Sequence, residues 1–391
     1  MSRPCVMLVA AEPSGDALGA ALAEALRARL DVRLVGVGGP LMARQGVESP
    51  FDIAPLAVLG IFDALAVYPM VRRRARETGA LAAREKPDVA VLIDSWGFNL
   101  RVAHAIRRAS PEVRLIKYVA PQVWATRPGR ARTLAHAVDR LLTIHSFDAP
   151  WFEAAGLKTT FVGNPVLIAG GAANSQRCRQ LIGAEASDPI LVIAPGSRHG
   201  EVSRLLGPFE EAARLLAADR PRLKIVATVA PSVAEGVIAR LRTWPMATHI
   251  ATTDEERRDA MAAATAALAC SGTVTTQFAL AGAPVVVAYR LDGPTAVIAR
   301  LLLHSRYITL MNVAAGREIA PEFVQGLCTG PRLATALAPL IDDPKTRERQ
   351  TSAQFRALEI MRGGVVDPVD AAAEAVIAEL PNSQPRDSSG V

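Results

Sequence analysis

The sequence predicts an α/β protein made of two doubly wound halves, each with a parallel sheet covered by helices. Short apolar runs of strand length alternate with longer helical segments along most of the chain. Such alternation implies parallel pairing through right-handed crossovers. The alternation pauses once, in a polar stretch at about residues 170–188, and then restarts. Aromatic residues make up only 5% of the chain, which suits helices packed on parallel strands better than a β-sandwich.

Strands are expected wherever a short apolar run occurs, and helices wherever apolar residues recur with helical spacing. The runs of the first half are residues 5–10, 32–37, 88–93, 113–119, 140–144 and 159–162. Those of the second half are residues 190–194, 223–227, 266–270 and 285–288. The clearest helices are residues 17–30, 100–108 and 201–217. Continuous apolar runs are typical of strands that are buried on both faces of a sheet.

Four parts follow from this pattern. Residues 1–170 form a first domain and residues 185–343 a second, while residues 344–380 are C-terminal helices. Residues 381–391 are polar and are expected to be disordered. The carboxyl ends of two such sheets would line a cleft, which is where doubly wound folds bind ligands.

Composition narrows the class of protein and its compartment. The charge of 44 Lys and Arg against 38 Asp and Glu gives +6, which suits a nucleic acid, an anionic membrane or a phosphorylated substrate without choosing among them. The four cysteines lack CxxC spacing, which favours free thiols in a reducing compartment. No signal peptide and no apolar run of about 18 residues is visible. We therefore expect a cytoplasmic protein, at most peripheral to a membrane.

Three turns between a strand and a helix have the character of anion sites. The first contains Glu12, Ser14, Gly15 and Asp16 and follows the first strand. Its amides could hold an anion or a sugar hydroxyl, but a plain capped turn explains the same residues and is favoured on pattern alone.

The other two turns lie in the second half. One contains Gly196, Ser197 and Arg198, and the other contains Ser271, Gly272 and Thr273. Arginine pairs with phosphate in a bidentate way, and a helix start offers backbone donors to a diphosphate. Two such turns at one sheet edge suggest a nucleotide diphosphate. A P-loop is missing, which argues against hydrolysis of ATP or GTP.

Asp94 follows the buried run of residues 88–93. A carboxylate at the carboxyl end of a central strand is a typical general base in an α/β enzyme, although a helix cap accounts for it equally well. The six histidines show no paired ligand spacing, so no metal site and no cofactor are expected.

One segment points to a membrane surface. Residues 58–76 join an apolar stretch to a cluster of arginines, as interfacial elements do. The apolar candidates are Ile61, Phe62, Leu65 and Met70, and the basic ones are Arg72, Arg73, Arg74 and Arg76. A core helix with a solvated basic end gives the same pattern and is the more common case. Residues 295–307 raise the same question.

Several ordered motifs resemble the lipid-A-disaccharide synthase family. They are AEPSGD at residues 11–16, VLGI at 58–61, YVAPQVWA at 118–125, FVGNP at 161–165, PGSR at 195–198, SGT at 271–273 and NVAAGRE at 312–318. The likeness runs from about Val6 to Asp343. It implies the GT-B architecture, in which two Rossmann-like domains face each other across a cleft.

The resemblance also implies an inverting glycosyl transfer. UDP-2,3-diacylglucosamine would donate its sugar to the 6-hydroxyl of 2,3-diacylglucosamine 1-phosphate, giving a β-1,6 disaccharide and UDP. The first domain would then hold the acceptor and face the cytoplasmic side of the inner membrane, and the second would hold the UDP-sugar. No cofactor and no nucleic acid is implied.

The same likeness assigns candidate residues. Asp94 corresponds to the family's motif aspartate and would be the catalytic base. The substrate-binding candidates are Glu12, Ser14, Gly15, Asp16, Asn99, Gln122, Trp124, Asn164 and Pro165. The UDP-binding candidates are Gly196, Ser197, Arg198, Ser271, Gly272, Thr273, Gln277, Asn312, Gly316, Arg317 and Glu318.

The chain departs from the family pattern at a few positions. The family usually shows a second acidic residue shortly after the Asp94 position, where this chain has Ser95, Trp96 and Gly97. It also often has glutamate in place of Gln277. Two alternatives stay open: another UDP-sugar enzyme of similar build, either a transferase or an epimerase, and an inactive lipid- or nucleotide-binding relative.

Overall fold

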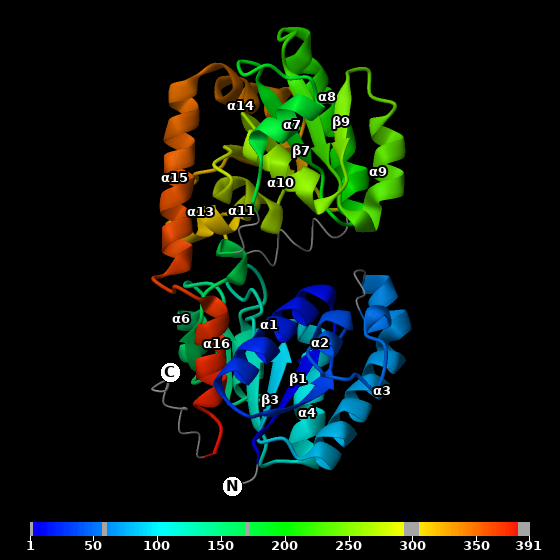
Figure 1. Ribbon diagram of the computed structural model, residues 1–391, viewed down its shortest axis with the longest axis vertical. Coiled ribbons are helices and arrows are strands. Elements are labelled where there is room, and N and C mark those ends of the chain that lie inside the picture. The colour runs from blue at the N-terminus through cyan, green and yellow to red at the C-terminus, as the bar shows by residue number, and fades with distance from the viewer. Residues whose placement is uncertain (1–2, 57–60, 169–171, 293–304, 382–391) are drawn as a thin grey trace, which may run out of the picture. The chain divides into compact units, whose positions relative to one another are not determined.

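A computed structural model describes residues 3–56, 61–168, 172–292 and 305–381, with the side chains of residues 61–67 left out. The chain divides into two compact units (Figure 1). The first contains residues 1–165 together with residues 364–391, and the second contains residues 166–363. Each unit has its own parallel sheet and its own core, so each is described separately.

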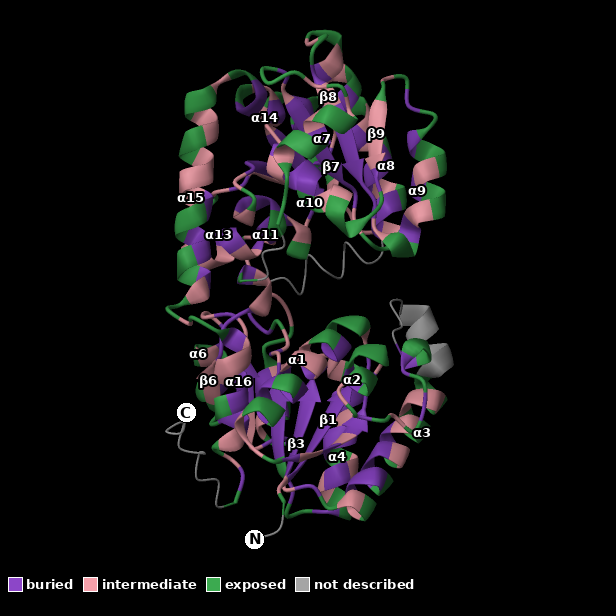
Figure 2. Ribbon diagram, in the orientation of Figure 1, coloured by how far each residue is buried: buried purple, intermediate pink, exposed green. Residues whose placement is uncertain are grey.

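The first unit is built on a six-stranded parallel sheet in the order β2-β1-β3-β4-β5-β6. Its strands are β1 (Cys5–Ala10), β2 (Arg33–Val37), β3 (Val89–Ile93), β4 (Arg114–Tyr118), β5 (Arg140–Thr143) and β6 (Lys158–Phe161). All residues of β1 and β3 are buried (Figure 2). Helices on both faces explain why these strands are apolar throughout.

Two helical layers cover this sheet. One layer packs against Leu8 and Val91 and contains α1 (Pro13–Arg29), α2 (Pro40–Arg44) and α16 (Pro368–Ile377). The other packs against Met7 and Leu92 and contains α3 (Ile61–Glu85), α4 (Trp96–Ala109), α5 (Gly129–Ala135) and α6 (Ala149–Glu153). Alternate residues of each strand therefore serve opposite cores.

The second unit repeats the plan, with the strand order β12-β11-β10-β7-β8-β9. Its strands are β7 (Ile190–Ala194), β8 (Lys224–Thr228), β9 (Thr248–Ala251), β10 (Ala266–Cys270), β11 (Val285–Tyr289) and β12 (Glu322–Val324). One face carries α8 (His199–Ala218), α9 (Ala234–Leu241) and α14 (Gly330–Asp342). The other carries α7 (Ser175–Leu181), α10 (Asp254–Ala263), α11 (Thr273–Leu280), α13 (Leu310–Ala315) and α15 (Pro344–Arg362).

The ten expected strands are all present, with ends within two residues of those expected. β9 and β12 are additional edge strands that the sequence did not reveal, because their residues are only partly buried and lack an apolar run. The first helix begins at Pro13 rather than at Ala17, so Ser14, Gly15 and Asp16 form its first turn instead of a separate loop.

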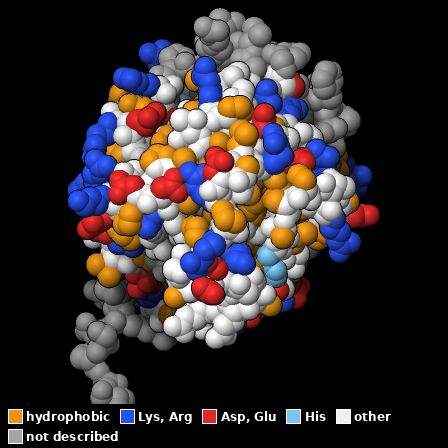
Figure 3. Space-filling view, turned by 90° about the horizontal axis from the view of Figure 1, so that it is seen from above, with side chains coloured by type: hydrophobic (Ala, Val, Ile, Leu, Met, Phe, Trp, Pro, Cys, Tyr) orange, Lys and Arg blue, Asp and Glu red, His pale blue; other side chains and the backbone are white. Residues whose placement is uncertain are grey.

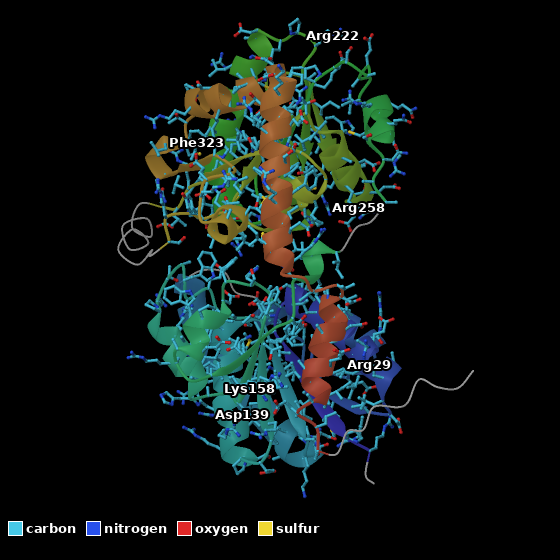
Figure 4. The ribbon with its side chains drawn as sticks, turned by 90° about the vertical axis from the view of Figure 1, so that its left-hand side faces the viewer. Arg29, Asp139, Lys158, Arg222, Arg258 and Phe323 are labelled. Atoms are coloured by element: carbon cyan, nitrogen blue, oxygen red, sulfur yellow. The ribbon has the colours of Figure 1, made fainter. Side chains whose placement is uncertain are left out.

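The last helix, α16, belongs to the first unit although the sequence groups it with α15. Its apolar face packs on α1, and ion pairs hold both of its ends. Arg29 of α1 binds Asp370 at 2.7 Å, while Arg140 and Lys158 bind Glu379 just after the helix at 2.7 and 3.1 Å. Figure 4 shows Arg29 and Lys158 on opposite sides of this helix.

Candidate functional site

Both sheets have a switch point, where consecutive crossovers leave in opposite directions. In the first unit β1 lies between β2 and β3, and in the second β7 lies between β10 and β8. Doubly wound folds bind ligands beyond the carboxyl ends of the strands at such points. The start of α1, which contains Ser14, and the turn of Asp94 adjoin the first switch point. The turns containing Arg198 and Gly272 adjoin the second.

Asp94 follows β3 in a strained turn. The φ angle is +51° at Asp94 and +36° at Ser95, so two consecutive non-glycine residues adopt left-handed conformations. Each such residue costs about 1–3 kcal/mol. The turn ends the strand abruptly and starts α4 at Trp96. Strain of this kind is kept only where the surroundings impose it.

Two buried side chains impose this turn. The amide nitrogen of Asn99 donates to the carbonyl oxygens of Ile93 at 2.7 Å and Asp94 at 2.9 Å. The ammonium of Lys117, on β4, donates to Leu92 at 3.2 Å, to Tyr118 at 3.1 Å and also to the carbonyl of Asp94. All three successive carbonyls at the end of β3 are therefore held by side chains.

Lys117 is also a charge buried beside the candidate base. It is 3% exposed. Burial lowers the pKa of its ammonium to about 7, while the carboxylates of Asp94 and Glu12 act in the opposite direction. The first unit thus places a titratable cation next to two candidate acidic residues.

The start of α1 faces the same turn. The hydroxyl of Ser14 donates to the Asp94 carboxylate at 3.0 Å. Gly15 is needed for this approach, because a β-carbon there would lie 3.3 Å from the Ala10 side chain and 3.4 Å from the Ile93 carbonyl. Glu12 is the N-cap residue of the helix. These residues bring the positive end of α1 to Asp94.

Asp16 has a different place from the other residues of its motif. Its carboxylate accepts hydrogen bonds from the backbone amides of Gly39, Leu41 and Met42 at 2.8 to 3.0 Å. The side chain is 2% exposed. Its oxygens are therefore engaged in fixing the start of α2, which accounts for the residue without a substrate.

The remaining acceptor candidates follow β4 and β6. Gln122 is exposed, Asn164 is buried and Pro165 is partly buried. Trp124 is buried and meets Phe147 edge to face, with ring centroids 5.4 Å apart. Gln122 is thus the member of this group most accessible to a ligand.

Trp124 also adjoins a buried carboxyl that sequence reasoning missed. Burial raises the pKa of Asp148 to about 7, against the opposing influence of the Trp124 indole and the His145 amide. Burial lowers the pKa of the His145 imidazole to about 4. At neutral pH the His145 imidazole is therefore neutral, while the Asp148 carboxyl is partly protonated.

In the second unit the turn after β7 is tightly built. Gly196 has a φ of +115°, and a β-carbon there would lie 2.9 Å from a carboxylate oxygen of Glu201. Arg198 forms an ion pair with Glu201 at 2.9 Å, and the carbonyl of Ser197 accepts a hydrogen bond from Ser232 at 2.7 Å. The Arg198 side chain stays about half exposed, and its guanidinium has further N–H donors besides the one in the pair.

The turn after β10 is more open. Gly272 and Thr273 are exposed at the start of α11, and no neighbouring atom lies within 4 Å of a β-carbon built on Gly272. Ser271 donates to the carbonyl of Ile308 at 3.3 Å. Gln277 is exposed on the same helix. This edge can admit a ligand close to the backbone.

Asn312 holds the next segment together rather than facing solvent. It is fully buried, accepts from the amides of Ile319 and Ala320, and donates to Glu322 at 2.8 Å. Gly316 ends α13 in a left-handed conformation. Arg317 and Glu318 are exposed beyond it. Asn312 thus positions these residues and has no free amide atom for a ligand.

The segment predicted to meet a membrane is described in part. Residues 58–60 and the side chains of Ile61, Phe62 and Leu65 lie outside the described residues, as do residues 295–304. Met70 packs on the core of the first unit. Arg73 and Arg74 pair with Glu77 at 2.8 and 2.7 Å. Arg72 and Arg76 are exposed on α3.

Metal sites, membrane-spanning helices and basic patches are other features to consider in the residues that the structure describes. Among those residues, no group of three His, Cys, Asp or Glu side chains could hold a metal ion, and no helix is long and apolar enough to cross a bilayer. On the face shown in Figure 3, Lys and Arg are interspersed with Asp and Glu rather than gathered into one patch.

Three important side chains were missed by sequence reasoning. Lys117 had a visible signal, because a lysine inside an otherwise apolar strand is almost always paired. Glu201 stands three residues after Arg198, the spacing of neighbours on a helix. Glu322 lies on an edge strand that was not expected, and its carboxylate accepts from the amides of Ile308 and Thr309 at 2.8 to 3.2 Å.

Known structures share this fold at low sequence identity. A Staphylococcus aureus MnaA–UDP complex covers 96% of this chain and 95% of its own, with a TM-score of 0.63 and 12% identity. The glycotransferase of kitacinnamycin covers 97% and 100%, with a TM-score of 0.59 and 17% identity. These likenesses confirm the predicted α/β fold of two Rossmann-like domains of the GT-B type.

Sequence comparison is more specific. A family model described as lipid-A-disaccharide synthetase matches residues 6–375. A lipid-A-disaccharide synthase of Rhodospirillum centenum is 40% identical over 95% of this chain and 94% of its own length. One of Paramagnetospirillum magneticum is 38% identical over 95% and 96%. The resemblance seen in the motifs is confirmed, and the chain belongs to the lipid-A-disaccharide synthase family of glycosyltransferases.

Proposed function

We propose that the chain transfers 2,3-diacylglucosamine from UDP to the 6-hydroxyl of 2,3-diacylglucosamine 1-phosphate, with inversion at the anomeric carbon. The observation that carries this proposal is the Asp94 turn. Its carboxylate stands at the switch point of the first sheet, and its backbone is fixed by Lys117 and Asn99. The relatives of the same family support the choice of substrates.

The reaction assigns each unit one half of the chemistry. Asp94 takes the proton of the acceptor hydroxyl as its oxygen bonds to the anomeric carbon of the donor. The bond from that carbon to the diphosphate breaks, and UDP leaves with the electron pair. Arg198 and the start of α11, in the second unit, would stabilise the negative charge that develops on UDP.

Contacts on the first unit would align the acceptor. Ser14 orients the Asp94 carboxylate, while Glu12 and Gln122 offer oxygens to sugar hydroxyls along the same edge. Ser271, Gly272, Thr273 and Gln277 would line the nucleotide, with Arg317 and Glu318 beyond them. Asn99 and Asn312 act through the backbone they hold, and Asp16 through α2.

We also propose that the enzyme works at the cytoplasmic face of the inner membrane. The acyl chains of both substrates stay in the bilayer, because each methylene exposed to water costs about 0.8 kcal/mol. Exposed Arg72 and Arg76 would meet anionic headgroups, each contributing on the order of 1 kcal/mol.

The central experiment incubates the purified protein with both diacylated substrates and detects disaccharide and UDP by mass spectrometry. Asp94→Asn should lower turnover by about 10²–10⁴-fold, because a positioned base contributes this much. UDP affinity and the unfolding midpoint should stay near the wild-type values, since the amide preserves the shape of the side chain. Near-normal turnover of this variant would assign Asp94 a purely structural role.

Lys117→Met should change how the free energy of unfolding depends on pH, because it removes the buried ammonium. Because the pKa of Lys117 is about 7 in the folded chain and near 10.5 when unfolded, the unfolded state binds more protons between these values. The wild type should therefore gain about 2–3 kcal/mol of unfolding free energy relative to the variant from pH 7 to pH 9. Urea unfolding measures this gap, and Lys345→Met, at an exposed lysine, serves as control. If the unfolding free energies of the wild type and Lys117→Met change in parallel with pH, Lys117 titrates as it does in water.

Arg198→Ala should weaken UDP binding and slow transfer, because a charge-assisted hydrogen bond to phosphate is worth roughly 1.5–3 kcal/mol. Calorimetry with UDP alone isolates this contact from the acceptor. Arg222→Ala provides the control, since this exposed arginine pairs with Asp188 near the amino end of β7 (Figure 4). Equal UDP affinities for wild type and Arg198→Ala would remove Arg198 from the donor site.

Changing Ile61, Phe62 and Leu65 together to serine should reduce binding to anionic vesicles and activity on micellar substrate, while UDP affinity is retained. High salt should weaken binding of the wild type by screening the arginines. Leu181→Ser, at an exposed apolar residue of the second unit, is the matched control. A folded triple variant with normal vesicle binding would place the docking surface elsewhere.

A further inference from the structure

Two arginines stand out near the candidate base: Arg127, in the connection from β4 to α5, and Arg130, in the first turn of α5. Arg130 is partly buried, and its guanidinium carbon lies 5.1 Å from the centre of the Trp96 ring. Trp96 begins α4 two residues after Asp94. The stacked guanidinium is therefore tied directly to the turn that carries the candidate base.

Arg130 is a partly buried cation with a second positive charge nearby. Burial lowers the pKa of its guanidinium, and the positive charge of Arg127 lowers it further. Within the described parts of the chain, neither arginine forms an ion pair with a carboxylate. By contrast, Arg33, Arg107 and Arg140 of the same unit each bind a carboxylate at 2.7 to 2.8 Å.

Two like charges near each other repel, and Arg130 also loses hydration through its partial burial, whereas Arg127 is exposed. The backbone adds to this cost, since Arg127 has a φ of +54° and precedes Pro128. A protein accepts such an arrangement where a ligand supplies the missing negative charge. Stacking on Trp96 leaves the N–H edge of Arg130 free to bind it.

We propose that Arg127 and Arg130, braced by Trp96, form a phosphate-monoester site that takes the phosphate of the acceptor sugar. This inference rests on the proposed function. Guanidinium groups bind the oxygens of a phosphate dianion in a bidentate way. The phosphate and the reacting hydroxyl belong to one sugar ring, so a phosphate held beside Trp96 aligns that ring with Asp94, two residues away in the chain.

The test compares acceptors with and without the phosphate. For the Arg127→Ala, Arg130→Ala and double variants, kcat/KM for the 1-phosphate should fall by roughly 10- to 150-fold per arginine, mainly through KM. The same constant for the dephosphorylated acceptor should hardly change. Arg130→Lys should restore part of the loss, and Arg108→Ala, at an exposed arginine at the far end of α4, should behave like the wild type.

Other outcomes separate the possible failures. If the variants keep the wild-type preference for the phosphorylated acceptor, the site is wrong while the proposed transfer stands. If the double variant loses binding to phosphatidylglycerol vesicles but keeps that preference, the arginines meet lipid headgroups, and the proposal is overturned. If the wild type makes no disaccharide, the proposed function fails. Calorimetry with glucosamine 1-phosphate against glucosamine then still tests the site, and equal affinities would reject it.

Discussion

The ammonium of Lys117 binds the carbonyl oxygens of Leu92, Asp94 and Tyr118 beneath the end of β3. A strand that ends in two left-handed residues leaves carbonyls that no neighbouring strand can reach, and buried carbonyls need donors. Lys117 supplies them from β4 and Asn99 from α4. The turn that presents Asp94 therefore depends on a buried charge, and replacing that charge changes both the geometry and the local electrostatics.

The second unit has a comparable arrangement, in which the buried charged group is negative rather than positive. There a buried carboxylate, Glu201, lies against Gly196 and pairs with Arg198, and Glu322 accepts from the amides of Ile308 and Thr309. In the first unit Lys117 holds the backbone of Asp94, and in the second Glu201 holds the guanidinium of Arg198. Such preorganisation lowers the reorganisation needed when charge moves during transfer.

The sequence predicted the fold well because strands buried on both faces leave long apolar runs that need no knowledge of the tertiary structure. It also singled out turns that the structure places beside both switch points, since short motifs follow those strands directly. It could not separate residues that face a ligand from residues that hold the backbone. Asp16 and Asn312 have the residue types of binding groups, yet their partners are amides that lie 23 to 26 and 7 to 8 residues away in the chain. Only the folded backbone reveals such pairings.

The contrast between paired and unpaired arginines extends this reasoning to the acceptor. Arg198 pairs with Glu201, so it is oriented before a ligand arrives, but the negative charge of its partner offsets part of its attraction for an anion. Arg127 and Arg130 form no ion pair with a carboxylate among the described residues, and Trp96 contacts the Arg130 guanidinium instead. An aromatic ring orients a guanidinium without neutralising it. In the proposed transfer, a leaving diphosphate would need a preorganised donor, whereas an acceptor drawn from a bilayer would need strong attraction, and the two kinds of arginine would match these two demands.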